Sequence, residues 1–263
     1  MQNPENKRFS NKVVVVTGAS RGIGQAICVA FAREGARVLG VARGDLDDTG
    51  KKVQAAGGWF FAINADLVKG TQKESAGLFA LILKHTGRVD VLVNNAGVIR
   101  RAPAVEYSQE DWDAVIQTNL SSPFFLCQAA AKWWLEEGRA KSPAGARLKI
   151  VNIASLLSFQ GGITVPAYTA SKHGIAGVTK ALANEWAKER INVNAIAPGY
   201  IATENTAALR EDVKRNQAIL ERIPEHRWGN PEDIAGGCVF LGSSDSDYFN
   251  GAVINIDGGW MGR

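Results

Sequence analysis

Short runs of β-branched residues alternate with longer alanine-rich segments along most of this chain. Val13 to Val16 is an unbroken apolar run, which is typical of a parallel strand buried on both faces. The alternation predicts an α/β fold, a doubly wound parallel sheet of about seven strands with helices on both faces. The other expected strands are Arg37–Val41, Trp59–Ile63, Val91–Val93, Leu148–Ile153, Ile191–Ile196 and Val253–Ile256. The clearest helical segments are Ile23–Arg33, Thr71–His85, Trp112–Leu135 and Tyr168–Lys188.

No internal repeat, low-complexity tract or long linker divides the 263 residues, so we expect residues 1–263 to form a single domain. Two stretches interrupt the alternation. Glu137–Ala146 is expected to be a surface excursion. Tyr200–Trp228 is expected to be a mobile loop over a binding site, because ligands bind beyond the carboxyl ends of the strands in such sheets.

Charge and cysteine content restrict the partners and the compartment. Lys and Arg total 30 against 26 Asp and Glu, which leaves +4 without a basic block, so no nucleic acid partner is expected. Cys28, Cys127 and Cys238 lie far apart and are odd in number, which predicts free, buried thiols in a reducing compartment. Met1 to Ser10 has no apolar signal core, and no segment reaches the roughly 20 apolar residues of a membrane span. We therefore expect a cytoplasmic protein without membrane contact. The histidines show no ligand spacing, so no metal site is expected.

A glycine-rich segment from Thr17 to Gly24 follows the first expected strand and opens the first expected helix, with the spacing G-x-x-x-G-x-G. Glycines let the backbone turn tightly and approach a pyrophosphate, whose charge then lies on the amides and dipole of the helix N-terminus. A plain strand-to-helix turn is the alternative. The position between strand and helix favours a Rossmann-like dinucleotide site. Its expected contacts are Gly18, Ser20, Arg21, Gly22, Ile23 and Gly24.

Two further strand ends offer cofactor contacts. Asp66 and Leu67 follow the third expected strand, and Asp66 is expected to accept a hydrogen bond from an adenine amino group. A helix cap is the alternative for this carboxylate. Asn95, Ala96 and Gly97 end the fourth strand, where small residues leave room for a ribose and a nicotinamide. A turn that needs Asn and Gly for its backbone angles would use the same residues, and both interpretations can hold.

The end of the second expected strand indicates which dinucleotide binds. An acidic residue there would bind a ribose 2′-hydroxyl and repel a 2′-phosphate. This chain has Ala42 and then Arg43 at that place, and Arg21 lies in the glycine-rich segment. Because two guanidiniums pair well with a phosphate, NADP(H) is favoured, and NAD(H) stays possible because Asp45 is close.

Four polar residues have the composition of a proton-transfer site. Tyr168 and Lys172 stand four residues apart, which places a phenol and an ammonium on one helix face. A free tyrosine has a pKa of about 10, and a nearby cation is expected to lower it. Ser155 would hold a substrate oxygen, and Asn119 would carry a water that links Lys172 to solvent. Chance spacing, a serine cap and a local helix break are the alternatives for these residues.

The chain resembles the short-chain dehydrogenase/reductase family over nearly its whole length. The family's motifs appear in order at Thr17–Gly24, Asn94–Gly97, Asn119, Ser155, Tyr168-x-x-x-Lys172 and Pro198-Gly199. The resemblance implies hydride transfer between a nicotinamide cofactor and a carbonyl or alcohol, with an Asn119-Ser155-Tyr168-Lys172 tetrad in which Tyr168 is the general acid or base. It also implies that Lys172 binds the nicotinamide ribose and that the enzyme is a homotetramer. Further implied cofactor contacts are Pro198, Gly199, Ile201 and Thr203.

The substrate is indicated by an arginine pair and by a closer resemblance. Arg100 and Arg101 follow the fourth-strand turn and are expected to clamp a carboxylate, while a solvated basic pair explains them equally well. Several segments are similar to the bacterial 2-dehydro-3-deoxy-D-gluconate 5-dehydrogenases, also called 2-deoxy-D-gluconate 3-dehydrogenases. This resemblance implies a keto-deoxy sugar acid that binds beside Ser155, Gln160 and Tyr168. The segments are Asn94–Arg101, Ser158–Gly162, Asn184–Lys188, Arg222–Pro224, Arg227–Gly229 and Asp257–Trp260.

Other functions remain open on the sequence alone. A 3-oxoacyl-carrier-protein reductase or a gluconate 5-dehydrogenase would share the core motifs, so that only the Arg100–Arg101 and Tyr200–Trp228 regions discriminate. A catalytically silent NADP(H)-binding redox sensor would need the glycine-rich segment without the proton-transfer group. Asp257–Trp260 is a candidate for contacts between subunits.

Overall fold

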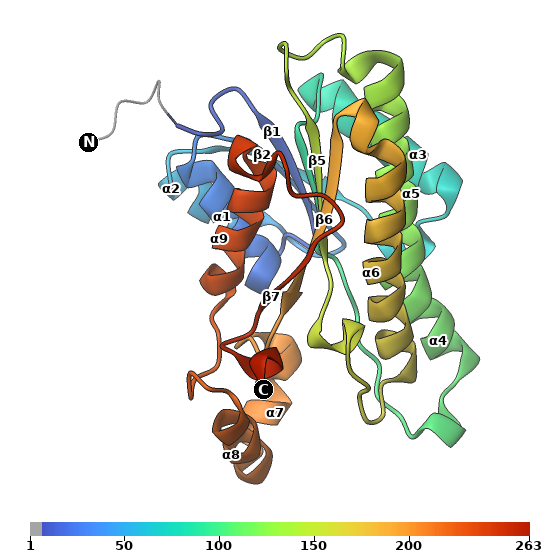
Figure 1. Cartoon of the computed structure of the whole chain (residues 1–263), viewed down its shortest axis with the longest axis vertical. Helices are drawn as coiled ribbons and strands as arrows, with labels where there is room; N and C mark the ends of the chain where they lie inside the picture. Colours follow the sequence, from blue (N-terminus) through green and yellow to red (C-terminus); the bar gives the residue numbers. More distant parts are fainter. Residues whose placement is uncertain (1–6) are drawn as a thin grey trace.

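Parallel strands form the centre of the molecule. The computed structural model describes residues 7–263, and within them seven strands make one sheet in the order β3-β2-β1-β4-β5-β6-β7 (Figure 1). Every neighbouring pair is parallel. The sequence-based prediction of a doubly wound, Rossmann-like sheet is therefore confirmed. The strands are β1 (Val13–Thr17), β2 (Arg37–Ala42), β3 (Trp59–Asn64), β4 (Val91–Asn94), β5 (Leu148–Ile153), β6 (Ile191–Pro198) and β7 (Val253–Ile256).

Helices cover both faces of the sheet (Figure 1). On one face, α1 and α9 pack against each other, and α2 lies beside α1. On the other face α3 packs on α5, and α6 packs on α4 and on β6. The helices are α1 (Gly22–Arg33), α2 (Asp47–Ala55), α3 (Gln72–Thr86), α4 (Gln109–Ile116), α5 (Ser122–Trp133), α6 (Pro166–Trp186), α7 (Ala207–Glu211), α8 (Val213–Arg222) and α9 (Pro231–Gly242).

The unbroken apolar runs follow from this burial on two sides. Val14 and Val16 belong to the core between the sheet and the α1–α9 layer, whereas Val15 belongs to the core under α3 and α5. Successive side chains of a strand point to opposite faces, so burial on both faces favours apolar residues at successive positions. The three free cysteines are buried in these two cores, as expected.

Two helical regions differ from the sequence-based expectation. The segment expected as one helix over Trp112–Leu135 begins at Gln109, where the Ser108 hydroxyl accepts a hydrogen bond from the Asp111 amide. The π-helical turn Gln117–Ser121 then interrupts it, and a second π-helical turn, Trp134–Gly138, follows α5 at its end. Each such turn inserts an extra residue into the helix, and these turns are frequent at functional sites.

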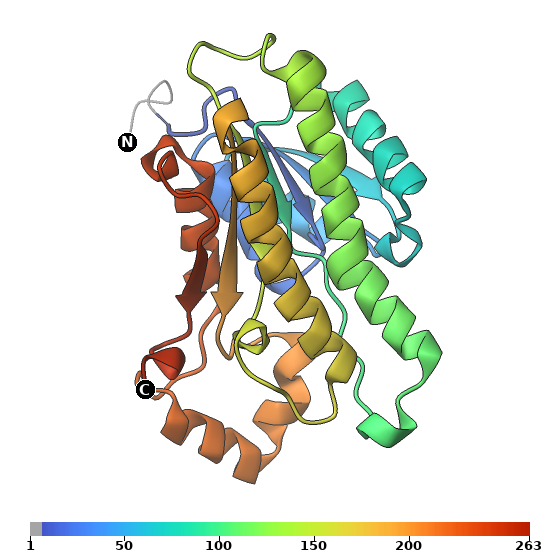
Figure 2. The same cartoon turned by 45° about the vertical axis from the view of Figure 1, so that its right-hand side comes forward.

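The expected loop Tyr200–Trp228 is largely helical, which corrects that prediction. It contains the 3₁₀ turn Glu204–Thr206 and the helices α7 and α8. Figure 2 shows both helices at the end of the sheet toward which the β6 and β7 arrows point. An apolar cluster holds this region, in which Ile219 of α8 and Ile223, which follows that helix, pack with Trp260. No helix in residues 7–263 has the length and apolar content that a bilayer crossing requires.

Candidate active site

A cavity of about 990 Å³ lies beyond the carboxyl ends of the central strands. Its walls come from the segments that follow β1, β2, β3, β4, β5 and β6 and from the first turns of α6. The strand order changes direction between β1 and β4, and ligands bind at such a switch point in open α/β sheets. The sequence-predicted residues that line it are Gly18, Ser20, Arg21, Gly22, Ile23, Gly24, Ala42, Arg43, Asp66, Leu67, Asn95, Ala96, Gly97, Arg101, Ser155, Tyr168, Lys172, Pro198, Gly199, Ile201 and Thr203.

The glycine-rich segment presents an uncapped helix N-terminus to this cavity. Arg21 precedes α1 in an extended conformation and makes no side-chain capping bond, so the first amides of α1 have no side-chain acceptor there. Gly18 and Gly22 adopt φ of 65° and 54°, which favours glycine. These features fit the pyrophosphate of a dinucleotide, whose negative charge is stabilised by helix N-terminal amides.

Asn95 holds the glycine-rich segment in place. Its side-chain amide donates to the carbonyl oxygens of Thr17 and Gly18 at 3.0 and 3.1 Å. The Thr17 hydroxyl in turn accepts from the backbone amides of Asn95 and Ala96, both at 3.0 Å. The β4 end therefore has two roles, since its residues line the cavity and also fix the turn that follows β1.

The opposite end of the cavity contains the phenol, the hydroxyl and the ammonium that the sequence predicts. Tyr168 and Lys172 lie one turn apart on α6, and Ser155 follows β5. The Ser155 hydroxyl is near enough to the Tyr168 phenol to lower its pKa. The Lys172 Nζ donates to the Ile153 carbonyl at 2.6 Å and lies 5.5 Å from the centroid of the Tyr168 ring. Burial lowers the pKa of the Lys172 ammonium to about 8.

The acidity of Tyr168 differs from the expectation. Burial raises the pKa of its phenol above the ordinary value, and this effect outweighs those of the Ser155 hydroxyl and of the Arg101 charge, both of which lower the pKa. The prediction that the Lys172 ammonium lowers the pKa of Tyr168 below its ordinary value is therefore wrong. A raised pKa keeps the phenol protonated at neutral pH, which suits a proton donor.

Asn119 lies beside the cavity rather than in its wall. The residue is buried in the first π-helical turn, where its carbonyl oxygen accepts from the Val98 amide and its amide nitrogen donates to the Val98 carbonyl, both at 2.9 Å. It also donates to the Ser171 hydroxyl at 3.2 Å. The side chain thus ties α6 to the segment after β4. The expected water between Asn119 and Lys172 stays a prediction.

Two residues predicted at the substrate are placed elsewhere. Arg100 does not line the cavity, and its guanidinium pairs with Asp111 at 3.3 Å on the molecular surface. Gln160 does not line the cavity either, since its side-chain oxygen accepts from the Trp260 indole at 3.1 Å. Of the arginine pair, only Arg101 faces the cavity.

Asp66 serves as the cap that the sequence left open as an alternative. One of its carboxylate oxygens accepts from the Val68 amide at 3.1 Å, at the start of the 3₁₀ turn Leu67–Lys69. The same residue also lines the cavity, so its role as a cap leaves the expected adenine contact possible. Within residues 7–263, no group of three or more His, Cys, Asp or Glu side chains is arranged to hold a metal ion.

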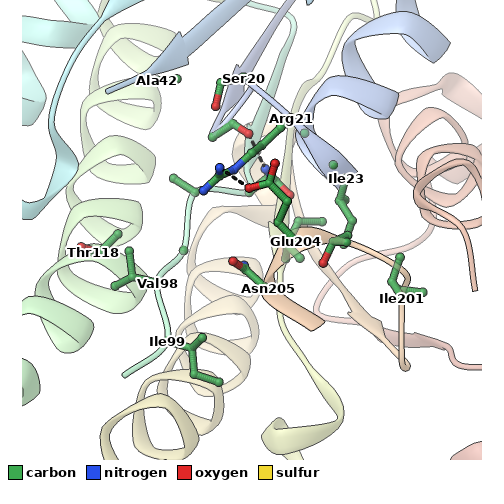
Figure 3. A pocket seen from close by; sticks show the side chains of 18 of the residues that line it. Ser20, Arg21, Ile23, Ala42, Val98, Ile99, Thr118, Ile201, Glu204 and Asn205 are labelled. Atoms are coloured by element: carbon green, nitrogen blue, oxygen red, sulfur yellow. Dashed lines mark hydrogen bonds and ion pairs between the residues drawn. The ribbon is translucent and has the colours of Figure 1, made fainter. Parts of the chain in front are cut away.

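The sequence missed several lining residues. Figure 3 shows Glu204 paired with Arg21 across the cavity mouth, and both side chains are exposed. Thr118 lines the wall from the first π-helical turn. The remaining polar additions, Asn205, Thr206 and Arg210, come from the segment that was expected to be a loop.

Comparisons with known proteins agree with this geometry. The family model described as short chain dehydrogenase matches residues 12–214. The 2-dehydro-3-deoxy-D-gluconate 5-dehydrogenase of Escherichia coli (strain K12) is 49% identical over 258 residues, which are 97% of this chain and 97% of that protein.

Two solved structures are also similar to this chain. A provisionally assigned 2-deoxy-D-gluconate 3-dehydrogenase from Agrobacterium tumefaciens with bound NADP is 52% identical, with a TM-score of 0.89 over 98% of this chain and 100% of that one. A provisionally assigned NAD(P)-dependent gluconate 5-dehydrogenase from Beutenbergia cavernae, with NADP at low occupancy, is 44% identical. Its TM-score is 0.88 over 97% of this chain and 98% of that one.

Proposed function

Because the chain belongs to the short-chain dehydrogenase family and is an oxidoreductase, we propose that it transfers a hydride between NADP(H) and a sugar acid. The reacting group would be a ketone or secondary alcohol of the 2-dehydro-3-deoxy-D-gluconate or 2-deoxy-D-gluconate type. The observation that carries the proposal is one cavity with an uncapped helix N-terminus at one end and the Tyr168–Ser155 pair at the other.

The residues of this chain would have the following roles in the reaction. When bound, the nicotinamide supplies or accepts the hydride. Tyr168 gives a proton to the substrate oxygen during reduction and takes it back during oxidation. Ser155 orients that oxygen through its hydroxyl, and Lys172 binds the nicotinamide ribose. Asn119 completes the tetrad by fixing the segment after β4 against α6.

Cofactor preference would follow from the basic residues at the adenosine end. Arg43 lines the cavity there, and so does Arg21, whose guanidinium would exchange its partner Glu204 for the 2′-phosphate. Ala42 leaves room where an acidic residue would repel that phosphate. The two related structures with bound NADP support this choice. NAD(H) would be the weaker cofactor, since Asp45 also lines the cavity and adds a negative charge.

The acid group of the substrate would be bound by Arg101. Its guanidinium lines the cavity, and its charge lowers the pKa of Tyr168, so it acts on the reacting end of the site. A guanidinium binds a carboxylate through charge-assisted hydrogen bonds. Arg100 is its natural control, because it precedes Arg101 in the chain and pairs with Asp111 instead.

The experiment measures turnover of a panel of keto-deoxy sugar acids with NADPH and NADH, in the wild type, Arg101→Met and Arg100→Met. We expect sugar-acid turnover with a higher kcat/KM for NADPH. Loss of a charge-assisted hydrogen bond is expected to raise the KM of the acid about 10- to 100-fold in Arg101→Met. Arg100→Met, which removes only a surface ion pair, is expected to stay within about twofold.

Three results would contradict the proposal. Turnover of 3-oxoacyl thioesters but not of sugar acids would indicate the acyl reductase, and NADPH binding without any carbonyl turnover would indicate the redox sensor. An equal or better kcat/KM with NADH would reject the cofactor preference. An unchanged KM in Arg101→Met would remove the carboxylate contact.

The proposal extends to the assembly and the compartment. A single domain over the whole chain, acting as a homotetramer in the cytoplasm, is supported by the family resemblance and by three buried, free thiols. Strand β7 is an edge of the sheet, and the exposed Tyr248 and Phe249 precede it, which suits contact between copies. Sedimentation is expected to give about four times the chain mass of 28.2 kDa, and a monomer would refute the assembly.

A further inference from the structure

The last residues of the chain, Asp257–Arg263, form a compact C-terminal turn after β7. One carboxylate oxygen of Asp257 accepts from the Gly259 amide and the other accepts from the Met261 amide, both at 2.9 Å. Figures 1 and 2 show this turn at the same end of the sheet as α7 and α8. Only 5% of Trp260 is exposed, so its side chain packs within the chain.

Trp260 and Arg263 of this turn contact helix α8. The Trp260 ring packs in the apolar cluster that contains Ile219, and the Arg222 guanidinium lies 4.0 Å from the ring centroid. A guanidinium is attracted to the face of an aromatic ring. The Arg263 guanidinium donates to the carbonyls of Glu221, at 2.9 Å, and of Arg222. These are the last carbonyls of α8, which have no partner within the helix.

The Trp260 ring also contacts the segment that carries Ser155. The indole nitrogen donates to the Gln160 side-chain oxygen at 3.1 Å, and Leu156 belongs to the same apolar cluster. Leu156 directly follows Ser155, whose hydroxyl accepts from the Leu157 amide at 3.2 Å. The orientation of the Ser155 hydroxyl therefore depends on the position of the 3₁₀ turn that follows it.

That 3₁₀ turn has a second point of attachment on α6. The buried Ser158 hydroxyl donates to the Lys172 carbonyl at 2.6 Å. Tyr168 lies one helical turn from Lys172, so this bond fixes the segment after β5 to the helix that carries the proton donor. The segment that carries Ser155 is thus held by α6 and by Trp260.

We propose that Trp260 is a positioning residue for the reaction, which couples helix α8 to the segment that carries Ser155. Helix α8 buries only Ile219 among its own residues, so it depends on the cluster around Trp260 for its position. Helix α8 also follows α7 closely, and Arg210 of α7 lines the cavity. A shift of these two helices would therefore reach Ser155 through one side chain. The inference rests on the proposed function only in that Ser155 orients a substrate oxygen.

The test compares Trp260→Phe, which keeps an aromatic ring and removes the indole N–H, with the matched control Trp134→Phe. The Trp134 indole donates to the Glu189 carbonyl at 2.9 Å, just before β6 begins and away from the cavity. Amide hydrogen exchange is measured by mass spectrometry on the full chain without substrate. In Trp260→Phe, the amides of α8 and of residues 155–160 are expected to exchange about 3- to 10-fold faster. In Trp134→Phe, both segments are expected to stay within about twofold of the wild type.

Variants of Gln160 separate the indole hydrogen bond from the packing of the ring. Gln160→Met removes the acceptor at similar length and is expected to speed exchange in both segments as Trp260→Phe does. Gln160→Glu keeps an oxygen acceptor and is expected to exchange like the wild type. The double variant Trp260→Phe/Gln160→Met is expected to exchange no faster than the faster single variant, because both changes remove the same bond. Should Trp260→Phe not fold, Gln160→Met and Gln160→Glu provide the comparison.

Steady-state kinetics with the sugar acid gives a second readout. In Trp260→Phe, kcat/KM for the acid is expected to fall about 3- to 10-fold, as for one lost hydrogen bond. The Kd of NADPH is expected to stay within about twofold, because Trp260 does not line the cavity. Trp134→Phe is expected to lower the Tm, since it leaves a space in the core, with kcat/KM within about twofold.

Three outcomes would overturn the inference. Faster exchange in only one of the two segments would show that Trp260 does not couple them. An equal effect of Trp134→Phe would indicate a general loss of stability. A further loss of kcat/KM in the double variant would indicate that Gln160 contacts the substrate directly. The exchange measurements need no sugar acid, so failure of the substrate assignment would leave their result intact.

Discussion

Tyr168→Phe is expected to lower kcat/KM by about 10²- to 10⁴-fold, the usual contribution of a well-placed proton donor. Phenylalanine keeps the ring beside Lys172, whose Nζ lies 5.5 Å from the ring centroid, and removes only the hydroxyl. The Kd of NADPH, measured by fluorescence titration, is therefore expected to change less than about threefold. Steady-state kinetics in both directions checks the loss.

Tyr107→Phe is the matched control for this variant. The Tyr107 hydroxyl donates to the Arg100 carbonyl at 3.3 Å and does not line the cavity. Its removal is expected to leave kcat/KM within about twofold. Near-normal turnover in Tyr168→Phe would show that another group transfers the proton.

The direction of the Tyr168 pKa shift adds a pH dependence. Reduction needs the protonated phenol, which the raised pKa maintains through neutral pH. Oxidation of the alcohol needs the phenolate, whose population grows as pH rises toward that pKa. We therefore expect wild-type oxidation to gain rate above neutral pH. If Tyr168→Phe still oxidised the alcohol faster above neutral pH, the pH effect would not come from the Tyr168 phenol.

The sheet could be predicted because its signal is local. The strands are mostly apolar, and burial on both faces favours such runs whatever the neighbours are. The helix boundary at Gln109 was missed because the apolar pattern starts only at Trp112. Ser108 and the acidic residues Glu110 and Asp111 carried the signal of a helix start.

The helices of the Tyr200–Trp228 segment could not be predicted from its pattern. Helix α8, with the sequence VKRNQAILER, is mostly exposed and buries only Ile219 among its own residues. Its partners in the apolar cluster, Trp260 and Leu156, are remote in the sequence. A segment stabilised by such long-range contacts has little periodicity of its own.

Neighbouring residues in the site also show what cannot be predicted from the sequence. Arg100 and Arg101 are chemically identical, and only the position of Asp111 on α4 decides which guanidinium is paired on the surface. Glu204 and Thr118 belong to no motif, since an ion pair across a cavity mouth and an unpaired buried hydroxyl exist only in three dimensions. The glycine-rich segment could be predicted because one short stretch contains all its constraints.

Gly24→Ala is expected to abolish tight dinucleotide binding, with a rise in the Kd of NADPH of more than about 100-fold. A Cβ at this position would lie 2.1 Å from the Gly18 carbonyl oxygen and 2.5 Å from the Asn95 side-chain nitrogen. Backbone cannot yield as a flexible side chain does, so the first turn of α1 must move away from the segment that follows β1. The amides that would bind the pyrophosphate then lose their common orientation.

The free energy of unfolding of Gly24→Ala should fall together with its affinity for NADPH. Overpacking costs about 1–3 kcal/mol, which corresponds to a fall in Tm of roughly 3–10 °C for a chain of this size. Gly236→Ala is the control, because a Cβ there meets nothing within 4 Å, and alanine is the better helix former within α9. Its Tm is expected to stay equal or rise, with NADPH affinity unchanged. If Gly24→Ala bound NADPH like Gly236→Ala does, the contact between α1 and the β1 turn would not be what shapes the phosphate site.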